Sequence, residues 1–251
     1  MMAEPAPLQQ SLGGRRVLIT GGAGAVGRAV ARRMAGEGAR VLVTDRTAVD
    51  LQRVVEDIGG DAVQAIVADL SSSADVTRVF EAVDEDFGGL DILVACAGVG
   101  SGPLLEMDEA GWRNVIETNL VSYVACTQQA LKRMKAAGSR DGMVILVGSI
   151  SVHIKAVGES VYNASKGGVA SFAETLRKEL IDEQIRLTLI EPGAIASSLQ
   201  PFTAEERSRL VDDYQLLPPE QVAEAILFAT TRPPGVDVVT LRIEPLRQKI
   251  F

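Results

Sequence analysis

Short runs of β-branched residues alternate with longer helical patterns along almost the whole chain of 251 residues. The first unit is RRVLIT, residues 15–20, which passes through the glycine-rich turn GGAGAVG into a helical pattern that ends near residues 36–38. Strands that are separated by helices are joined by right-handed crossovers, and these build a parallel sheet with helices on both faces. The alternation therefore predicts a doubly wound α/β fold.

The same pattern predicts about seven strands in one domain. We expect strands at 15–20, 40–44, 62–68, 91–95, 143–149, 185–191 and near 236–243, and further helices at 49–58, 74–87, 109–136, about 160–181 and 219–229. A short helix is expected within an irregular stretch after Pro192–Gly193. Residues 1–14 lack the basic start and apolar stretch of a secretory signal, so we expect a flexible arm there and a single domain over 15–251.

Composition excludes several classes of function. The formal net charge of −8 disfavours capture of nucleic acid or anionic lipid, so a small-molecule partner is expected. The apolar runs are far too short to span a bilayer, which predicts no membrane partner and a cytoplasmic location. Cys96 and Cys126 lack metal-ligand spacing and His153 is the only histidine, so we expect reduced, buried thiols and no metal site.

The glycine-rich turn is a candidate phosphate cradle. A helix N-terminus that follows glycines offers unpaired backbone N–H groups and the positive end of the helix dipole, which suit a pyrophosphate. Glycine-rich turns also occur for packing reasons alone, so the motif needs support from its context. The predicted contacts are Gly21, Gly24, Ala25, Val26 and Gly27.

Acidic residues follow the second and third strands. Asp45 ends the second strand, where a carboxylate can accept hydrogen bonds from the adenosine ribose hydroxyls, and this favours NAD over NADP. Arg46 is the opposing signal, since a guanidinium can cover a 2′-phosphate, and NADP therefore stays open. Asp69, followed by Leu70, either meets the adenine edge or forms a turn with Ser71–Ser73; Asp45 and Arg46 can equally be plain turn residues.

A tyrosine and a lysine stand four residues apart in VYNASKGG. Residues i and i+4 share one helix face, so Tyr162 and Lys166 can point into the same cleft. A lysine charge ~5 Å from the phenol at an effective dielectric of ~20 contributes about 3 kcal/mol toward the phenolate. The pair can thus supply a general acid–base, although the same spacing also occurs in solvated surface pairs.

Taken together, the motifs TGGAGAVG, AGV, TNL, GSIS, YNASK and EPGAI resemble those of the short-chain dehydrogenase/reductase family, in order and spacing from about Arg15 to Ile243. The resemblance implies a Rossmann-type fold, a homodimer or homotetramer, and conversion between a secondary alcohol and a ketone. It makes Tyr162 the proton donor or acceptor, Ser149 the hydrogen-bond partner of the substrate oxygen, and Lys166 the group that lowers the Tyr162 pKa and holds the nicotinamide ribose. Asn119 would keep a water in a proton relay.

The resemblance also extends the cofactor site and places a substrate lid at about 194–215. It implies cofactor contacts at Tyr162 and Lys166 themselves and, from the following loops, at Ala97, Gly98, Pro192, Gly193, Ile195 and Ser197.

The chain departs from the family pattern at two motifs. Ala25 stands where the family has a glycine, which puts a methyl close to the pyrophosphate. Ala95-Cys96-Ala97-Gly98 replaces N-N-A-G, so we expect the tie between neighbouring strands to be lost and replaced by apolar packing. These departures motivate an alternative function, a catalytically silent dinucleotide-binding sensor or scaffold; a non-redox lyase or dehalogenase on the same fold ranks last because the glycines leave the cleft open.

Other residues have simpler interpretations. Ser151 competes with Ser149 for the same role but fits the family spacing less well. Lys155 and His153 are expected to be loop residues, although Lys155 can also contact an anionic substrate. Val115, Leu120 and Val124 form an apolar stripe that predicts core. The C-terminal stretch resembles reductases of small hydroxy acids, many of them NADP-linked, which conflicts with Asp45.

Overall fold

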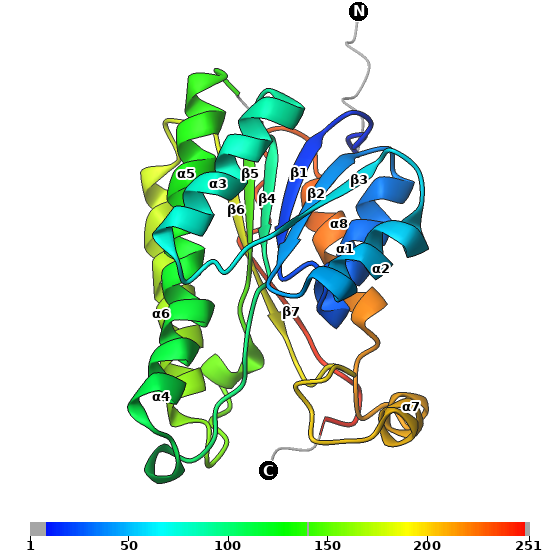
Figure 1. Ribbon diagram of the computed structural model, residues 1–251, viewed down its shortest axis with the longest axis vertical. Helices are drawn as coiled ribbons and strands as arrows, with labels where there is room; N and C mark the ends of the chain where they lie inside the picture. Colours follow the sequence, from blue (N-terminus) through cyan, green and yellow to red (C-terminus); the bar gives the residue numbers. More distant parts are fainter. Residues whose placement is uncertain (1–8, 140, 249–251) are drawn as a thin grey trace, which may run out of the picture.

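A seven-stranded parallel sheet forms the centre of the computed structural model, which describes residues 9–139 and 141–248. The strand order is β3-β2-β1-β4-β5-β6-β7, as Figure 1 shows. This confirms the predicted doubly wound α/β fold with its seven strands. Their bounds are β1 Arg16–Thr20, β2 Arg40–Asp45, β3 Val63–Val67, β4 Ile92–Ala95, β5 Met143–Val147, β6 Arg186–Pro192 and β7 Thr240–Ile243.

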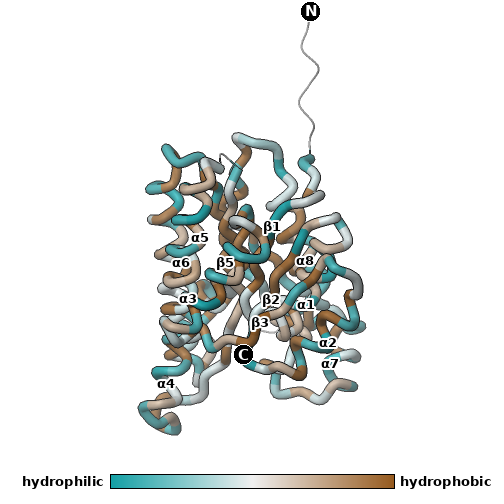
Figure 2. The backbone as a smooth tube through the Cα atoms, turned by 45° about the horizontal axis from the view of Figure 1, so that its top comes forward, coloured by the Kyte–Doolittle hydropathy of each residue, from teal (hydrophilic) through white to brown (hydrophobic). Residues whose placement is uncertain are grey.

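Helices cover both faces of the sheet, with α1, α2 and α8 on one side and α3, α5 and α6 on the other (Figure 1). Alternating strand residues supply the two cores: Leu18 packs toward the α3 and α5 side, whereas Val17 and Ile19 pack toward the α1 and α8 side. A strand that is buried on both faces is apolar at nearly every position. In Figure 2 the strands at the centre are coloured as hydrophobic, and the helices around them are more polar. The helices are α1 Ala25–Gly36, α2 Ala48–Ile58, α3 Ser73–Ala82, α4 Glu109–Ile116, α5 Ser122–Ala136, α6 Ser160–Glu179, α7 Ala204–Asp212 and α8 Pro219–Thr230.

The helix predicted over 109–136 is interrupted. A π-helical turn, Glu117–Val121, joins α4 to α5 and contains Asn119, and a second π-helical turn, Val83–Phe87, follows α3. Such turns insert a residue into the helical repeat and are frequent at functional sites. Short 3₁₀ turns occupy Leu104–Glu106 and Ile150–Val152.

Two other expectations need correction. Val124 was predicted to be core, but it is 40% exposed on α5, since it follows Val115 by nine residues, about two and a half helical turns, and so faces the opposite way. Val115 is buried and Leu120 is partly buried against the core. The last strand starts at Thr240 rather than near Val236.

The end of the predicted N-terminal arm is attached to the domain. Leu12 is buried in the core beside α1 and α8, and the backbone N–H of Gln10 donates to the Thr231 carbonyl. Residues 1–8 of that arm lie outside the described residues. Among the described helices, none combines the length and apolarity that crossing a bilayer requires.

Candidate active site

The turn between β1 and α1 brings the backbone close to two neighbouring segments. Gly21 has φ +67°, and a Cβ there would lie 2.6 Å from the Ala97 Cα. A Cβ on Gly27 would lie 2.2 Å from the Gly21 carbonyl oxygen. Only glycine fits at these two positions, so the turn is shaped by close backbone packing as well as by any ligand.

The N-terminus of α1 is open toward a cleft. Gly24 is the N-cap residue, the helix has no side-chain cap, and its first turn contains no acidic residue. The first N–H groups of a helix have no partner within it, so those of Ala25, Val26 and Gly27 are available to an anion. Ala25 is the first residue of α1, so its methyl is accommodated within an ordinary helical turn.

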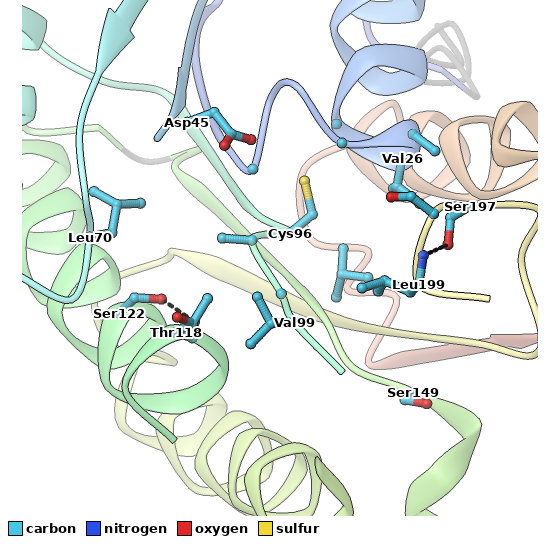
Figure 3. A pocket seen from close by; sticks show the side chains of 18 of the residues that line it. Val26, Asp45, Leu70, Cys96, Val99, Thr118, Ser122, Ser149, Ser197 and Leu199 are labelled. Atoms are coloured by element: carbon cyan, nitrogen blue, oxygen red, sulfur yellow. Dashed lines mark hydrogen bonds between the residues drawn. The ribbon is translucent and has the colours of Figure 1, made fainter. Parts of the chain in front are cut away.

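The acidic residues after β2 and β3 border the same cleft. One Asp45 carboxylate oxygen accepts from the Ala23 N–H at 3.1 Å, and the other accepts from the Arg46 N–H at 2.7 Å. Asp69 accepts hydrogen bonds from the backbone N–H and the side-chain hydroxyl of Ser71. It therefore forms a turn with Ser71, which is one of the two interpretations that the sequence offers for this residue. Leu70 and the exposed Arg46 also line the cleft, and in Figure 3 Asp45 and Leu70 lie at the end of the cleft away from Ser149.

The strand tie that we expected to be lost is present in another form. The Cys96 thiol donates to the Thr20 carbonyl at 2.9 Å, and the backbone N–H groups of Cys96 and Ala97 donate to the Thr20 hydroxyl at 3.2 and 3.3 Å. A thiol and a threonine hydroxyl therefore join the ends of β1 and β4. Both thiols are free, but only Cys126 is buried as predicted, whereas Cys96 is half-buried and lines the cleft. Desolvation raises the pKa of each thiol to about 12.

Ser149 and Tyr162 lie where the cleft meets a second cavity, since both residues line both spaces. Ser149 follows β5 and caps the 3₁₀ turn, and Tyr162 lies in the first turn of α6. Ser151 lines the second cavity but is absent from the described lining of the cleft, which favours Ser149 as the residue beside a reacting oxygen.

Lys166 is buried behind this pair. Its ammonium donates to the Val147 carbonyl at 2.9 Å and to the Tyr123 hydroxyl at 3.3 Å, while it lies 6.0 Å from the centre of the Tyr162 ring. Burial lowers the pKa of Lys166 to about 8. Tyr123 was missed in the sequence because α5 reads there as an ordinary core helix.

The phenol of Tyr162 is not activated in this arrangement. Burial raises its pKa, a hydrogen bond with Ser149 opposes that rise, and the nearby Glu159 charge adds to it. The predicted lowering of the Tyr162 pKa by Lys166 is therefore absent from this structure, because the ammonium is directed to Val147 and Tyr123.

Asn119 is held by two segments of the site. Its side-chain amide donates to the Val99 carbonyl at 2.9 Å and to the Ser165 hydroxyl at 3.2 Å, and its oxygen accepts from the Val99 N–H at 2.8 Å. The π-helical turn thus fixes the loop after β4 against α6. Gly98, in that loop, lines the cleft together with Ala97.

The segment after β6 closes the other side of the cleft. Pro192, Gly193, Ile195 and Ser197 all line it, and Ile195 forms a bridge with Leu217. A Cβ on Gly193 would lie 2.0 Å from the Gln248 side-chain oxygen, which accepts from the Ala194 N–H at 3.0 Å. α7 supplies the short helix that was predicted within the lid region and begins with a Thr203–Glu206 capping box.

The remaining candidates lie outside the cleft. Lys155 is exposed and donates to the Val152 carbonyl, and His153 lies 2.9 Å from the buried carboxylate of Glu191. Neither lines the two spaces described above. In the part of the chain that the structure describes, no cluster of three potential metal ligands occurs.

Comparison with known proteins gives the family. The family model described as short chain dehydrogenase matches residues 15–208. The chain belongs to the short-chain dehydrogenase/reductase family. Farnesol dehydrogenase of Aedes aegypti is 31% identical, over 94% of this short-chain dehydrogenase and 98% of that protein.

Two solved structures of similar proteins contain nicotinamide dinucleotides. One is a 3-ketoacyl-(acyl-carrier-protein) reductase from Brucella melitensis complexed with NADH, with TM-score 0.84 and 30% identity over 95% of this chain and 100% of that one. The other is a metagenomic short-chain oxidoreductase in complex with NADP, with TM-score 0.80 and 27% identity over 94% and 99% of the two chains. Both kinds of dinucleotide thus occur among relatives of this short-chain dehydrogenase.

Proposed function

We propose that this protein is an NAD(P)(H)-dependent oxidoreductase that interconverts a secondary alcohol and a ketone, with Tyr162 as general acid–base. The observation that carries the proposal is the position of Ser149 and Tyr162 at the junction of the cleft and the second cavity. A substrate oxygen at this junction would contact two hydroxyl groups while the rest of the substrate fills the second cavity.

The residues of the cleft fit a dinucleotide. The open N-terminus of α1 would hold the pyrophosphate, Asp45 would accept hydrogen bonds from the adenosine ribose, and Asp69 with Leu70 would border the adenine. Ala97, Gly98 and the segment Pro192, Gly193, Ile195 and Ser197 would border the nicotinamide end. When bound, the cofactor supplies or accepts the hydride.

The protein's own residues would control the proton and the oxygen charge. In ketone reduction the Tyr162 hydroxyl transfers its proton to the substrate oxygen, and the Ser149 hydroxyl donates a hydrogen bond to that oxygen. Lys166, once turned from Val147 and Tyr123 toward Tyr162, would stabilise the phenolate that remains. Asn119 would act as a positioning residue, because its described contacts are with Val99 and Ser165.

Replacement of the phenol tests this function. We expect Tyr162→Phe to lower turnover of any ketone that the protein reduces by at least about 100-fold, the lower end of general acid–base contributions. Tyr214→Phe is the matched control, since Tyr214 is exposed and lies outside both cavities. Near-normal turnover by the Tyr162 variant would refute the proposal, and tight dinucleotide binding without any turnover would favour the sensor alternative.

We also propose a preference for NAD, on the basis of the Asp45 carboxylate beside the glycine turn. A ligand at 100 times its Kd raises the free energy of unfolding by about 2.7 kcal/mol. We therefore expect a larger rise in Tm with NADH than with NADPH, and a smaller difference in Asp45→Asn. A larger rise with NADPH in the native protein would assign the ribose site to Arg46.

We further propose that the protein forms a homodimer or homotetramer through α5. Val121 and Val124 are 47% and 40% exposed on adjoining turns, and such apolar exposure fits a surface that a second copy covers. Light scattering measures the mass directly. A native monomer at micromolar concentration would contradict this proposal.

A further inference from the structure

The second cavity contains a single acidic group. Most of its lining is apolar or weakly polar, with Ile150, Ile154 and Ala156 on one side and Leu199 on the other. Among its described lining residues, Glu159 is the only carboxylate, and lysine, arginine and histidine do not occur. The nearest basic side chains in the sequence, Lys155 and His153, are occupied by the Val152 carbonyl and by Glu191.

The carboxylate of Glu159 has no partner within the described part of the protein. Glu159 is the N-cap residue of α6, yet its side chain makes no capping hydrogen bond, and its backbone carbonyl alone accepts from the Asn163 N–H. The other acidic residues of this region differ, because Glu191 contacts His153 and Glu174 pairs with Lys178. Partial burial raises the pKa of Glu159.

Glu159 is also close enough to the reaction centre to act on it. It lies three residues before Tyr162, and its negative charge raises the pKa of that phenol. Glu159, Ser149 and Tyr162 line one cavity, so a group on a substrate carbonyl held at the two hydroxyls would share that cavity with the carboxylate. A group with N–H or O–H donors would satisfy it, whereas an anion would be repelled.

We propose that Glu159 is a specificity-determining residue that selects short ketones or secondary alcohols carrying a hydrogen-bond donor, an ammonium or a hydroxyl, next to the carbonyl carbon, and that rejects their carboxylate analogues. This inference rests on the proposed function, because it assigns the second cavity to the substrate. It opposes the hydroxy-acid substrates that the C-terminal stretch suggested.

A matched series of probes tests the inference. The four ketones 2-butanone, hydroxyacetone, aminoacetone and acetoacetate share the skeleton CH₃–CO–CH₂–X and differ in X, which is methyl, hydroxyl, ammonium or carboxylate. We expect kcat/KM for the better donor probe to exceed that for acetoacetate by about tenfold or more, as a hydrogen bond to a charged group implies. The comparison of hydroxyacetone with aminoacetone decides which donor is preferred.

Glu159→Gln is the test variant, because it keeps the shape and removes the charge. We expect it to reduce the preference over acetoacetate to within about threefold, while Glu174→Gln, on the exposed face of the same helix, keeps the native ratio. Two results would overturn the inference. One is a native enzyme whose kcat/KM for acetoacetate equals that for the donor probes, and the other is a kcat/KM ratio between these probes that Glu159→Gln leaves unchanged.

A binding measurement separates this inference from the proposed function. Calorimetry with the cofactor-loaded Tyr162→Phe protein gives dissociation constants for the four probes without turnover. Weaker binding of acetoacetate than of aminoacetone or hydroxyacetone, abolished by adding Glu159→Gln, supports the inference even if the native protein reduces none of the probes. Equal binding of all four overturns it even if the native protein is an active reductase.

Discussion

Replacement of Lys166 by Met should remove a specific pH dependence from the stability of the protein. Lys166 is only 4% exposed, and burial lowers its pKa from 10.5 to about 8. At 1.36 kcal/mol per pKa unit, that difference corresponds to ~3 kcal/mol. Because the side chain is almost fully buried, little of this value is lost to solvent screening.

The sign follows from the protons that each state binds. Below about pH 8 the lysine is charged in both the folded and the unfolded state, so the burial penalty is present in full. Between about pH 8 and 10.5 the unfolded state binds more protons, and the free energy of unfolding therefore rises with pH. The raised pKa values of Cys96 and Cys126 have the opposite effect above pH 9. Cys126 acts equally in native protein and variant, whereas the Lys166 charge lowers the pKa of Cys96, so the comparison is cleanest below pH 9.

Urea denaturation at pH 7, 8, 9 and 10 measures this contribution as a difference. We expect the native protein to gain about 2.5 kcal/mol relative to Lys166→Met between pH 7 and 10, most of the full ~3 kcal/mol. Lys178→Met, on the same helix but exposed, should give a curve parallel to that of the native protein. Parallel curves for the native protein and Lys166→Met would refute the reasoning, because they would mean that burial does not perturb this ammonium.

Three further predictions concern two residues that line the cleft, Gly27 and Cys96, and Tyr123, which contacts Lys166. Gly27→Ala should lower the free energy of unfolding by roughly 1–3 kcal/mol and weaken NADH-induced stabilisation, because the new methyl would meet the Gly21 carbonyl. Gly36→Ala, at the end of the same helix with open space around it, is the control, and equal effects of the two substitutions in a thermal melt would contradict the prediction. Tyr123→Phe should lower the free energy of unfolding by about 1–3 kcal/mol, since the hydroxyl accepts from Lys166 and donates to the Val147 carbonyl; an unchanged urea midpoint would show that these hydrogen bonds are dispensable. A colorimetric thiol reagent at pH 8 should label Cys96 only after unfolding in urea, because its thiolate is scarce and its S–H is bound to the Thr20 carbonyl; rapid labelling of the folded protein would show an accessible thiolate.

The sequence predicts most of the fold because its signals are local. The run MVILV is apolar at every position, RVLIT is apolar at its three central positions, and both are short, so they indicate buried parallel strands before any contact is known. Turn residues between them set the crossovers, and the strand order follows the doubly wound pattern. The cleft residues at the carboxyl ends of β1, β2 and β3 are predicted for the same reason.

The remaining features depend on contacts between distant segments. The π-helical turn adds one residue to a continuous helical pattern, and the apolar residues of that pattern do not mark where it falls. The direction of the Lys166 side chain depends on where the Tyr123 hydroxyl and the Val147 carbonyl lie, and no spacing within YNASK contains that information. The thiol that replaces an asparagine as a strand tie is equally non-local.

The seating of Gln248 has a practical consequence for handling the protein. Its side-chain oxygen occupies the space beside Gly193, so the chain's last described residue touches the loop that borders the candidate reaction centre. Figure 1 shows the described N-terminal end at the other end of the molecule, near the start of β1. An affinity tag or a surface linkage is therefore better attached at the N-terminal end, which keeps it away from the contact between Gln248 and the segment Gly193–Ala194.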